Sequence, residues 1–265
     1  MVDRQMDLFG QRPLPITPHD SAVADLRPMI QAAPTDAALI AALPVAGLQD
    51  CVGLTAEAGR RQLAEAVPAL ARLCLRFSGW GKDALVPEQV AALSALTRIG
   101  GRAAGDVVVA GIVQSVFIGP TLGPAVAAAA ALDAVLPEKT LLRLLRHGDP
   151  HLRANACRCV RASPPVTAVL IELLDDLHPA AVQAAACALG RAGRIEARPH
   201  LTRLLREEPT PEIIEALALI ADKDDIIQLG RLAQRVPVLA PSVLDALESS
   251  DHPHAATIAS MLQGV

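Results

Sequence analysis

The chain has 265 residues, a formal net charge of −4, and 52% hydrophobic but only 2% aromatic residues. Its apolar mass is therefore Ala, Leu, Val and Ile, which favours closely packed helices over a β-sandwich. The mildly negative charge excludes nucleic-acid binding driven by global charge. Five cysteines without disulfide-like spacing, and an opening rich in charge and proline in place of a signal peptide, predict a cytoplasmic protein.

The first part of the chain differs from the rest in composition. Residues 1–34 contain several prolines and little hydrophobic periodicity, which predicts a tail and linker. Residues 35–265 are rich in Ala and Leu with helical periodicity and are expected to form one helical repeat domain. The two parts are therefore expected to serve different purposes.

The tail carries a short apolar motif, QMDLF, in otherwise polar surroundings. It resembles the motif with which bacterial proteins dock on the replicative sliding clamp, whose usual form is Gln, an apolar residue, Ser or Asp, Leu and Phe. All five positions match, and the resemblance implies partner contacts by Gln5, Met6, Leu8 and Phe9. The alternative is that Leu8 and Phe9 cover an exposed apolar end of the helical domain.

Four segments before residue 137 are expected to be helices: 58–77 with a break or kink at Pro68, 87–99, 105–117 and 125–136. Between Val107 and Leu132 no residue is charged, so the length alone would permit a membrane span. Two Gly-Pro pairs divide this stretch, and its many alanines transfer weakly into hydrocarbon. Two buried helices are therefore the preferred interpretation.

From residue 137 onward the sequence repeats. Segments 141–162, 170–193 and 201–224 each begin with a leucine-rich amphipathic run, pass through a turn with proline and end in an alanine-rich run. Equivalent residues in the second run fix the register, because positions i and i+4 share a helix face. They are Leu152, Val182, Ile214 and Val243, followed four residues later by Ala156, Ala186, Ala218 and Leu247. The pattern predicts all-α, two-helix units of about 30 residues stacked into a superhelix.

The start of the second helix in each unit has its own signals. Pro150 and Pro179 suit a first helical position, where a missing N–H is harmless. Asp149 and His178 precede them at the expected N-cap, although histidine is a poor capping residue. Asp149 and Arg153 are four residues apart and are expected to form a helix ion pair of about 0.3 kcal/mol.

DPHLRANA at 149–156 matches the turn aspartate, proline and apolar-arginine pattern of HEAT repeats. The chain resembles this family, and within it the short bacterial repeats also seen in phycobilisome-lyase-type proteins. The resemblance is good over 137–224 and weaker to 263, since Gln183 and Glu215 stand where the first copy has Arg153. It implies an α-α superhelix, a HEAT-like solenoid that binds another protein and needs no cofactor.

A series of cations follows the repeat register. Nine residues after each apolar anchor stand Arg161, Arg191, Lys223 and His252, which would form a ladder along one edge of a stacked solenoid. One explanation is that cations at helix C-termini interact favourably with the helix macrodipole. The other is a basic strip for a partner rich in carboxylates or phosphates. Arg161, Arg191 and Lys223 are therefore candidate partner-binding residues.

Little in the sequence points to catalysis or to a metal. RIGGRAAGD at 98–106 is Gly-rich but follows no strand, and the His-Glu pair that iron hydroxylases with HEAT-like repeats use as ligands does not occur. Cys157 and Cys159 would point about 200° apart on a helix and so are expected to be core residues. His252 and His254 are expected to be ordinary loop residues. No catalytic residue, metal or cofactor is expected.

These observations favour a non-enzymatic scaffold or adaptor that binds another protein. The alternative is a DNA replication or repair factor recruited by the clamp motif, with possible but weak DNA contact. HEAT-like DNA glycosylases line their groove with aromatic and basic residues, whereas this chain has no Tyr and one Trp. Residues 137–206 hold 11 Lys/Arg against 6 Asp/Glu, and residues 207–265 hold 3 against 10, which marks a binding surface or merely solvated faces. A chromophore-lyase-type role is a third hypothesis.

Overall fold

The computed structural model describes residues 34–264. Asp36–Val265 form one compact unit. Within the described residues it contains α-helices and short 3-10 turns and no strand, which confirms the predicted all-α fold. The helices are α1 (Asp36–Ala42), α2 (Leu48–Arg60), α3 (Val67–Arg76), α4 (Pro87–Ile99), α5 (Gly101–Val113), α6 (Leu122–Ala131), α7 (Glu138–Leu145), α8 (Pro150–Arg158), α9 (Pro164–Glu172), α10 (Pro179–Arg191), α11 (Arg198–Glu207), α12 (Pro211–Ala218), α13 (Lys223–Arg235), α14 (Ala240–Glu248) and α15 (Ala255–Gln263).

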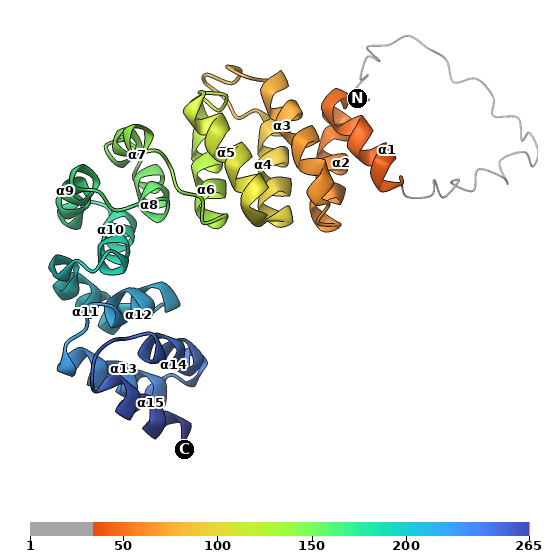
Figure 1. The fold of residues 1–265 in the computed structure, drawn as a ribbon. Helices are drawn as coiled ribbons and strands as arrows, with labels where there is room; N and C mark the ends of the chain where they lie inside the picture. Colours follow the sequence, from red (N-terminus) through yellow and green to blue (C-terminus); the bar gives the residue numbers. More distant parts are fainter. Residues whose placement is uncertain (1–33, 265) are drawn as a thin grey trace, which may run out of the picture. The chain divides into compact units, whose positions relative to one another are not determined.

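The helices of this unit form stacked antiparallel pairs (Figure 1). The even-numbered helices make a continuous row, in which each helix from α2 to α14 packs against the next even-numbered one. Odd-numbered helices pack on this row: α3 on α4, α5 on α6, α7 on α8, α9 on α10, α11 on α12 and α13 on α14. Each pair buries its apolar face against its neighbours, as the repeat pattern predicts for a solenoid.

The four apolar anchors occupy equivalent places in the even row. Leu152 in α8 is 3% exposed, Val182 in α10 is 7% exposed, and Ile214 in α12 and Val243 in α14 are fully buried. Burying each such side chain contributes about 1.5–3 kcal/mol to folding. The residues four positions later are also buried, which confirms the predicted register: Ala156, Ala186, Ala218 and Leu247.

Proline and a capping side chain begin α8 and α10. In α8 the Asp149 carboxylate accepts a hydrogen bond from the His151 N–H at 2.9 Å. In α10 the His178 imidazole accepts one from the Ala180 N–H at 3.3 Å. Both residues are N-caps, as expected, and each helix has proline at its first position.

The expected Asp149–Arg153 ion pair does not form. Asp149 is engaged in capping α8, and Arg153 instead binds Asp176, in the connection that leads to α10. The Asp176 carboxylate and the Arg153 guanidinium are mostly shielded from water, whereas the Asp149 carboxylate is exposed. The shielded pair is therefore the stronger one. The prediction was wrong because it considered only neighbours along one helix.

Helix boundaries in the first half differ from the predictions. The segment 58–77 is divided outright: α2 ends at Arg60 and Pro68 is the second residue of α3, where proline suits a helix start. The helix expected at 105–117 begins four residues earlier, because Gly100 and Gly101 have φ of +72° and +78° and turn the chain directly out of α4. The helix expected at 125–136 runs instead from 122 to 131.

The uncharged stretch 107–132 forms two helices. It contains the end of α5, a 3-10 turn at Gly119–Thr121 and all of α6. Gly119 has φ of +53°, and a Cβ there would collide with the Lys82 carbonyl oxygen, so the turn requires glycine. None of the helices in residues 34–264 has the length and apolarity needed to cross a membrane.

Candidate functional site

The pentapeptide with Gln5, Met6, Leu8 and Phe9 lies outside the described residues. Its two explanations, clamp docking and covering an end of the stack, therefore stay as predictions. The other candidate residues fall within the helical unit.

The connections that follow the even-numbered helices lie along one edge of the stack, which we call the connection edge. Neighbouring helices of the even row run parallel, because an antiparallel helix separates them in the chain, so their C-terminal ends share one side. Hydrogen bonds join successive connections: the Leu136 N–H donates to the Cys159 carbonyl at 3.0 Å, and the Ser250 hydroxyl donates to the Ala218 carbonyl at 3.0 Å. These bonds tie together the connections that follow α6 and α8, and those that follow α12 and α14.

The three predicted cations each lie in or directly beside a connection of this edge. Arg161 follows α8, Arg191 is the last residue of α10, and Lys223 begins α13 just after the connection from α12. A cation at the C-terminus of a helix suits Arg191, but Lys223 stands at an N-terminus, where the macrodipole opposes it. Lys223 also lies between Asp222 and Asp224, so its surroundings are acidic.

Three hollows lie around Ala162 on the connection edge, with volumes of about 390, 140 and 530 Å³. Ala162 lines all three of them. Arg161 borders the first hollow, Arg158 and Arg191 the second, and Arg194 the third. Arg158 and Arg194 were missed from the sequence because they do not fall on the nine-residue register.

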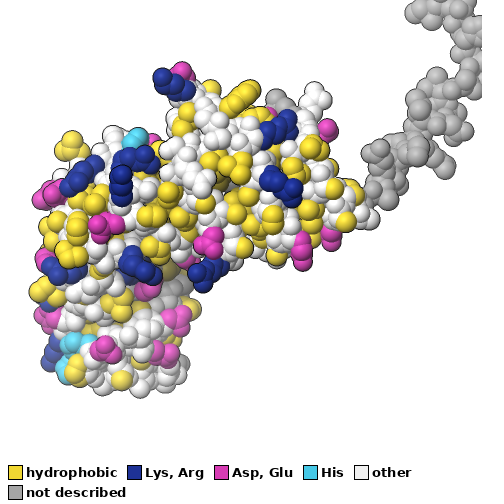
Figure 2. All heavy atoms as spheres, turned by 45° about the horizontal axis from the view of Figure 1, so that its top comes forward, with side chains coloured by type: hydrophobic (Ala, Val, Ile, Leu, Met, Phe, Trp, Pro, Cys, Tyr) yellow, Lys and Arg dark blue, Asp and Glu magenta, His cyan; other side chains and the backbone are white. Residues whose placement is uncertain are grey.

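The four arginines differ in their partners. Arg158 forms an ion pair with Glu212 of α12 at 3.1 Å, and Arg194 forms one with Glu196 at 2.5 Å. Among the described residues, no carboxylate lies within ion-pair distance of Arg161 or Arg191, and both side chains are exposed. On the face drawn in Figure 2, positive side chains are interspersed with acidic and hydrophobic ones and form no continuous positive tract.

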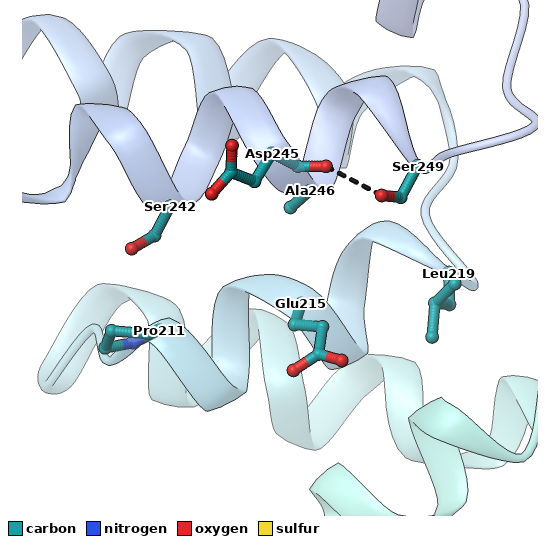
Figure 3. Close-up of a pocket in the computed structure, with 7 residues that line it drawn as sticks. All are labelled: Pro211, Glu215, Leu219, Ser242, Asp245, Ala246 and Ser249. Atoms are coloured by element: carbon teal, nitrogen blue, oxygen red, sulfur yellow. Dashed lines mark hydrogen bonds between the residues drawn. The ribbon is translucent and has the colours of Figure 1, made fainter.

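A further hollow of about 350 Å³ lies between α12 and α14, in the even row. Figure 3 shows Glu215 on α12 and Asp245 on α14 at its two sides, with Ser242 along the same wall as Asp245. The Ser249 hydroxyl donates to the Asp245 carbonyl at 2.8 Å and so completes the end of α14. The sequence did not predict this groove, because it depends on how two helices from different repeats face each other.

The cysteines behave as core residues. Cys157 and Cys159 are 0% and 1% exposed, which confirms their predicted burial. Burial raises the pKa of both thiols to about 12, and it raises the pKa of Cys187 to about 11. Burial therefore favours the protonated thiol at neutral pH, and the thiol is less nucleophilic than the thiolate. In residues 34–264 no group of three or more His, Cys, Asp or Glu side chains is arranged to hold a metal ion.

Two further features concern aromatic rings. His252 and His254 pack edge to face with ring centroids 5.5 Å apart, and the His252 imidazole accepts a hydrogen bond from the His254 N–H at 3.2 Å. Trp80, which the sequence analysis did not single out, is 64% exposed and packs edge to face on Phe77 with centroids 5.9 Å apart. Its exposure offers a contact surface, but nothing in the described residues indicates what would cover it.

Comparison with known proteins supports the resemblance to HEAT repeats. Residues 137–221 match the family model of HEAT repeats. The match spans α7 to α12 and contains all four arginines that border the hollows. HEAT repeats generally act as scaffolds for protein–protein interaction. Among curated proteins, no sequence matches this chain.

Proposed function

We propose that this protein is a non-enzymatic adaptor, which binds another protein through the surface of its solenoid and docks a second partner through its tail. The observation that carries the proposal is the HEAT-repeat match over 137–221, the part of the stack that bears the arginine-bordered hollows. A stack of helical pairs offers an extended surface for a protein partner. The partner-binding residues of the solenoid are Arg161, Arg191 and Lys223.

The tail partner in this proposal is the bacterial sliding clamp. The support is the match of QMDLF at all five positions of the clamp-docking motif. Gln5 hydrogen-bonds at the rim of the clamp pocket and Met6 lies against it, while Leu8 and Phe9 enter the pocket. Affinity is modest, because ordering a tail segment opposes binding.

We also propose that the protein is bacterial and cytoplasmic. Its HEAT repeats are of the short kind seen in phycobilisome-lyase-type proteins. Five free, buried cysteines are consistent with a reducing compartment. The DPHLRANA segment at 149–156 supports the repeat type.

Clamp capture by the full chain tests the tail. Purified clamp is passed over immobilised wild-type protein, a variant lacking residues 1–12, and Leu8→Ala/Phe9→Ala. Wild type is expected to retain clamp and both variants to lose it, because the two apolar side chains supply most of the buried area. Equal retention by wild type and the double variant would remove the clamp from the proposal.

The second candidate function is a clamp-recruited factor in DNA replication or repair. QMDLF favours it, since the motif would bring the solenoid to DNA. Retention on a DNA column at rising salt separates it from a pure adaptor, because phosphate contacts weaken steeply with salt. An adaptor without DNA function is expected to elute already at low salt.

A further inference from the structure

We propose that the arginine-bordered hollows of the connection edge are the docking site for an extended acidic segment of a protein partner. We call this part of the edge the arginine edge; it comprises Arg158, Arg161, Arg191 and Arg194. The inference rests on the proposed adaptor function and names the kind of partner that the solenoid surface takes.

The shape of the site suits an extended chain. The three hollows share lining residues and therefore adjoin one another across three successive connections. Their floor combines small and apolar residues, including Ala162, Pro164, Ile171 and Val135, and the last of these is 45% exposed. Each of the three hollows has at least one arginine in its lining. A chain that alternates apolar and acidic side chains would contact both kinds of surface.

The charges of the site select carboxylates. Arg158 and Arg194 each already bind one glutamate, whereas Arg161 and Arg191 have no acidic partner among the described residues. An exposed guanidinium without a partner can take a carboxylate through two parallel hydrogen bonds. Arg161 and Arg191 are therefore the primary contacts of the proposed ligand.

The spacing of these two arginines predicts the spacing of the acidic residues. Arg161 lies in the connection after α8 and Arg191 is the last residue of α10, and these two helices pack directly against each other. Packed helices are about 8–10 Å apart, and an extended chain advances about 3.3 Å per residue. Carboxylates three positions apart, as in Glu-x-x-Glu, therefore fit the two arginines.

The site is also held in place before any ligand binds. The Leu136 N–H bonds to the Cys159 carbonyl at 3.0 Å, and the Ser163 hydroxyl donates to the Glu138 carboxylate at 2.6 Å. These bonds join the connection before α7, and the first residue of α7, to the connection before α9. A preorganised surface loses less conformational entropy on binding, which favours a short linear ligand.

Nucleic acid fits this surface less well than an acidic peptide does. Glu138, Glu196 and Glu212 lie among the arginines and would repel a continuous row of phosphates. The residues that line the hollows include no aromatic side chain on which a base could stack. A peptide can place its carboxylates between these acids, whereas a phosphate backbone has a fixed charge spacing.

The test uses the full chain and two labelled peptides of equal composition. One 16-residue peptide carries Glu at every third position, and the other carries the same glutamates in one block. Binding is measured by fluorescence anisotropy at low salt. We expect the spaced peptide to bind wild type at least about 10-fold more tightly than it binds Arg161→Glu/Arg191→Glu. In the variant, two charge-assisted contacts become repulsive. The blocked peptide is expected to bind wild type more weakly than the spaced one.

A matched control separates site contacts from net charge. Arg143→Glu/Arg146→Glu makes the same charge change near the C-terminus of α7, away from the arginine edge. Like the edge variant, it removes cations that interact favourably with a helix macrodipole. It is expected to bind the spaced peptide within about threefold of wild type. Thermal unfolding of both double variants checks that each remains folded. Lys223→Glu is expected to weaken binding of the spaced peptide less than Arg161→Glu/Arg191→Glu does, because Asp222 and Asp224 flank Lys223.

Three results would overturn the inference. They are equal binding of the spaced peptide to wild type and to Arg161→Glu/Arg191→Glu, equal loss in the two double variants, and tighter binding of a 16-nucleotide single-stranded DNA than of the spaced peptide at the same salt. Any of them leaves the tail proposal intact, because clamp capture depends on Leu8 and Phe9. Conversely, failure of clamp capture with normal peptide binding would count against the tail alone.

Discussion

Arg153 of α8 binds Asp176 of the next repeat through two parallel hydrogen bonds: Nε to Oδ2 and Nη2 to Oδ1, each at 2.8 Å. The side chains are 15% and 9% exposed. Arg153 also donates to the carbonyls of His147 and Gly148, so the guanidinium joins the turn before α8 to the connection before α10. The pair is therefore a stabilising contact between repeats.

Removing one partner of this pair is expected to destabilise the fold. Arg153→Ala and Asp176→Ala should each lower the free energy of unfolding by about 2–4 kcal/mol, because each leaves a shielded charge without its partner. Urea unfolding of both single variants and the double variant measures the coupling, expected at about 1–3 kcal/mol. Arg203→Ala, at an exposed position of α11, should change stability by less than about 0.5 kcal/mol. Purely additive losses would show that the pair is not coupled.

The same pair predicts acid sensitivity. Hydrogen bonding to Arg153 lowers the pKa of Asp176, so the folded state holds this proton less tightly than the unfolded state. The stability it contributes is present above the unfolded pKa of about 3.9 and is lost as pH falls through the lower folded pKa. Asp176→Asn should be less stable at neutral pH and should lose less further stability below about pH 4. Parallel pH profiles for wild type and variant would contradict this.

The approach of α10 to α12 depends on Gly190. A Cβ at this position would lie 2.7 Å from the Ala216 carbonyl oxygen and 2.9 Å from the Leu201 side chain. Gly190→Ala is therefore expected to lower the free energy of unfolding by about 1–3 kcal/mol. Gly53→Ala is the control: it is a helical glycine with nothing within 4 Å of a new Cβ, and it should raise stability by about 0.5–1 kcal/mol. Thermal unfolding of the two variants should shift in opposite directions.

The thiols should be protected in the folded protein. All five cysteines are buried, and burial raises the pKa of Cys74, Cys157 and Cys159 to about 12. Because the thiolate is the reactive form, Ellman's reagent should label the native protein only slowly and should label five thiols after unfolding in urea. Rapid labelling of one thiol in the native state would show that its helix opens locally.

The repeat half of the fold could be predicted because its signals are local. The spacing of Leu152, Val182, Ile214 and Val243 and the prolines at helix starts follow directly from the sequence, and their burial confirms the register. The start of α5 could not be predicted in this way, since it depends on the backbone conformation of Gly100 and Gly101.

The surface features needed knowledge of packing. The register placed Arg161 and Arg191 on one edge, but the hollows beside them arise where three connections meet, and no single segment shows this. The groove between Glu215 and Asp245 likewise depends on how α12 faces α14. The pairing of Arg153 with Asp176 of the next repeat likewise depends on how the repeats stack.

Several helices begin with proline, as at Pro150, Pro179 and Pro211. Proline disfavours the helical conformation of the residue before it, so the helix does not extend further toward the N-terminus. The start of each of these helices is therefore set by its local sequence, whereas contacts between repeats hold the helices together. A segment from one such proline to the next is therefore expected to keep its helix start when it is moved within the array. Duplicating or deleting one should lengthen or shorten the array while leaving the flanking modules in frame.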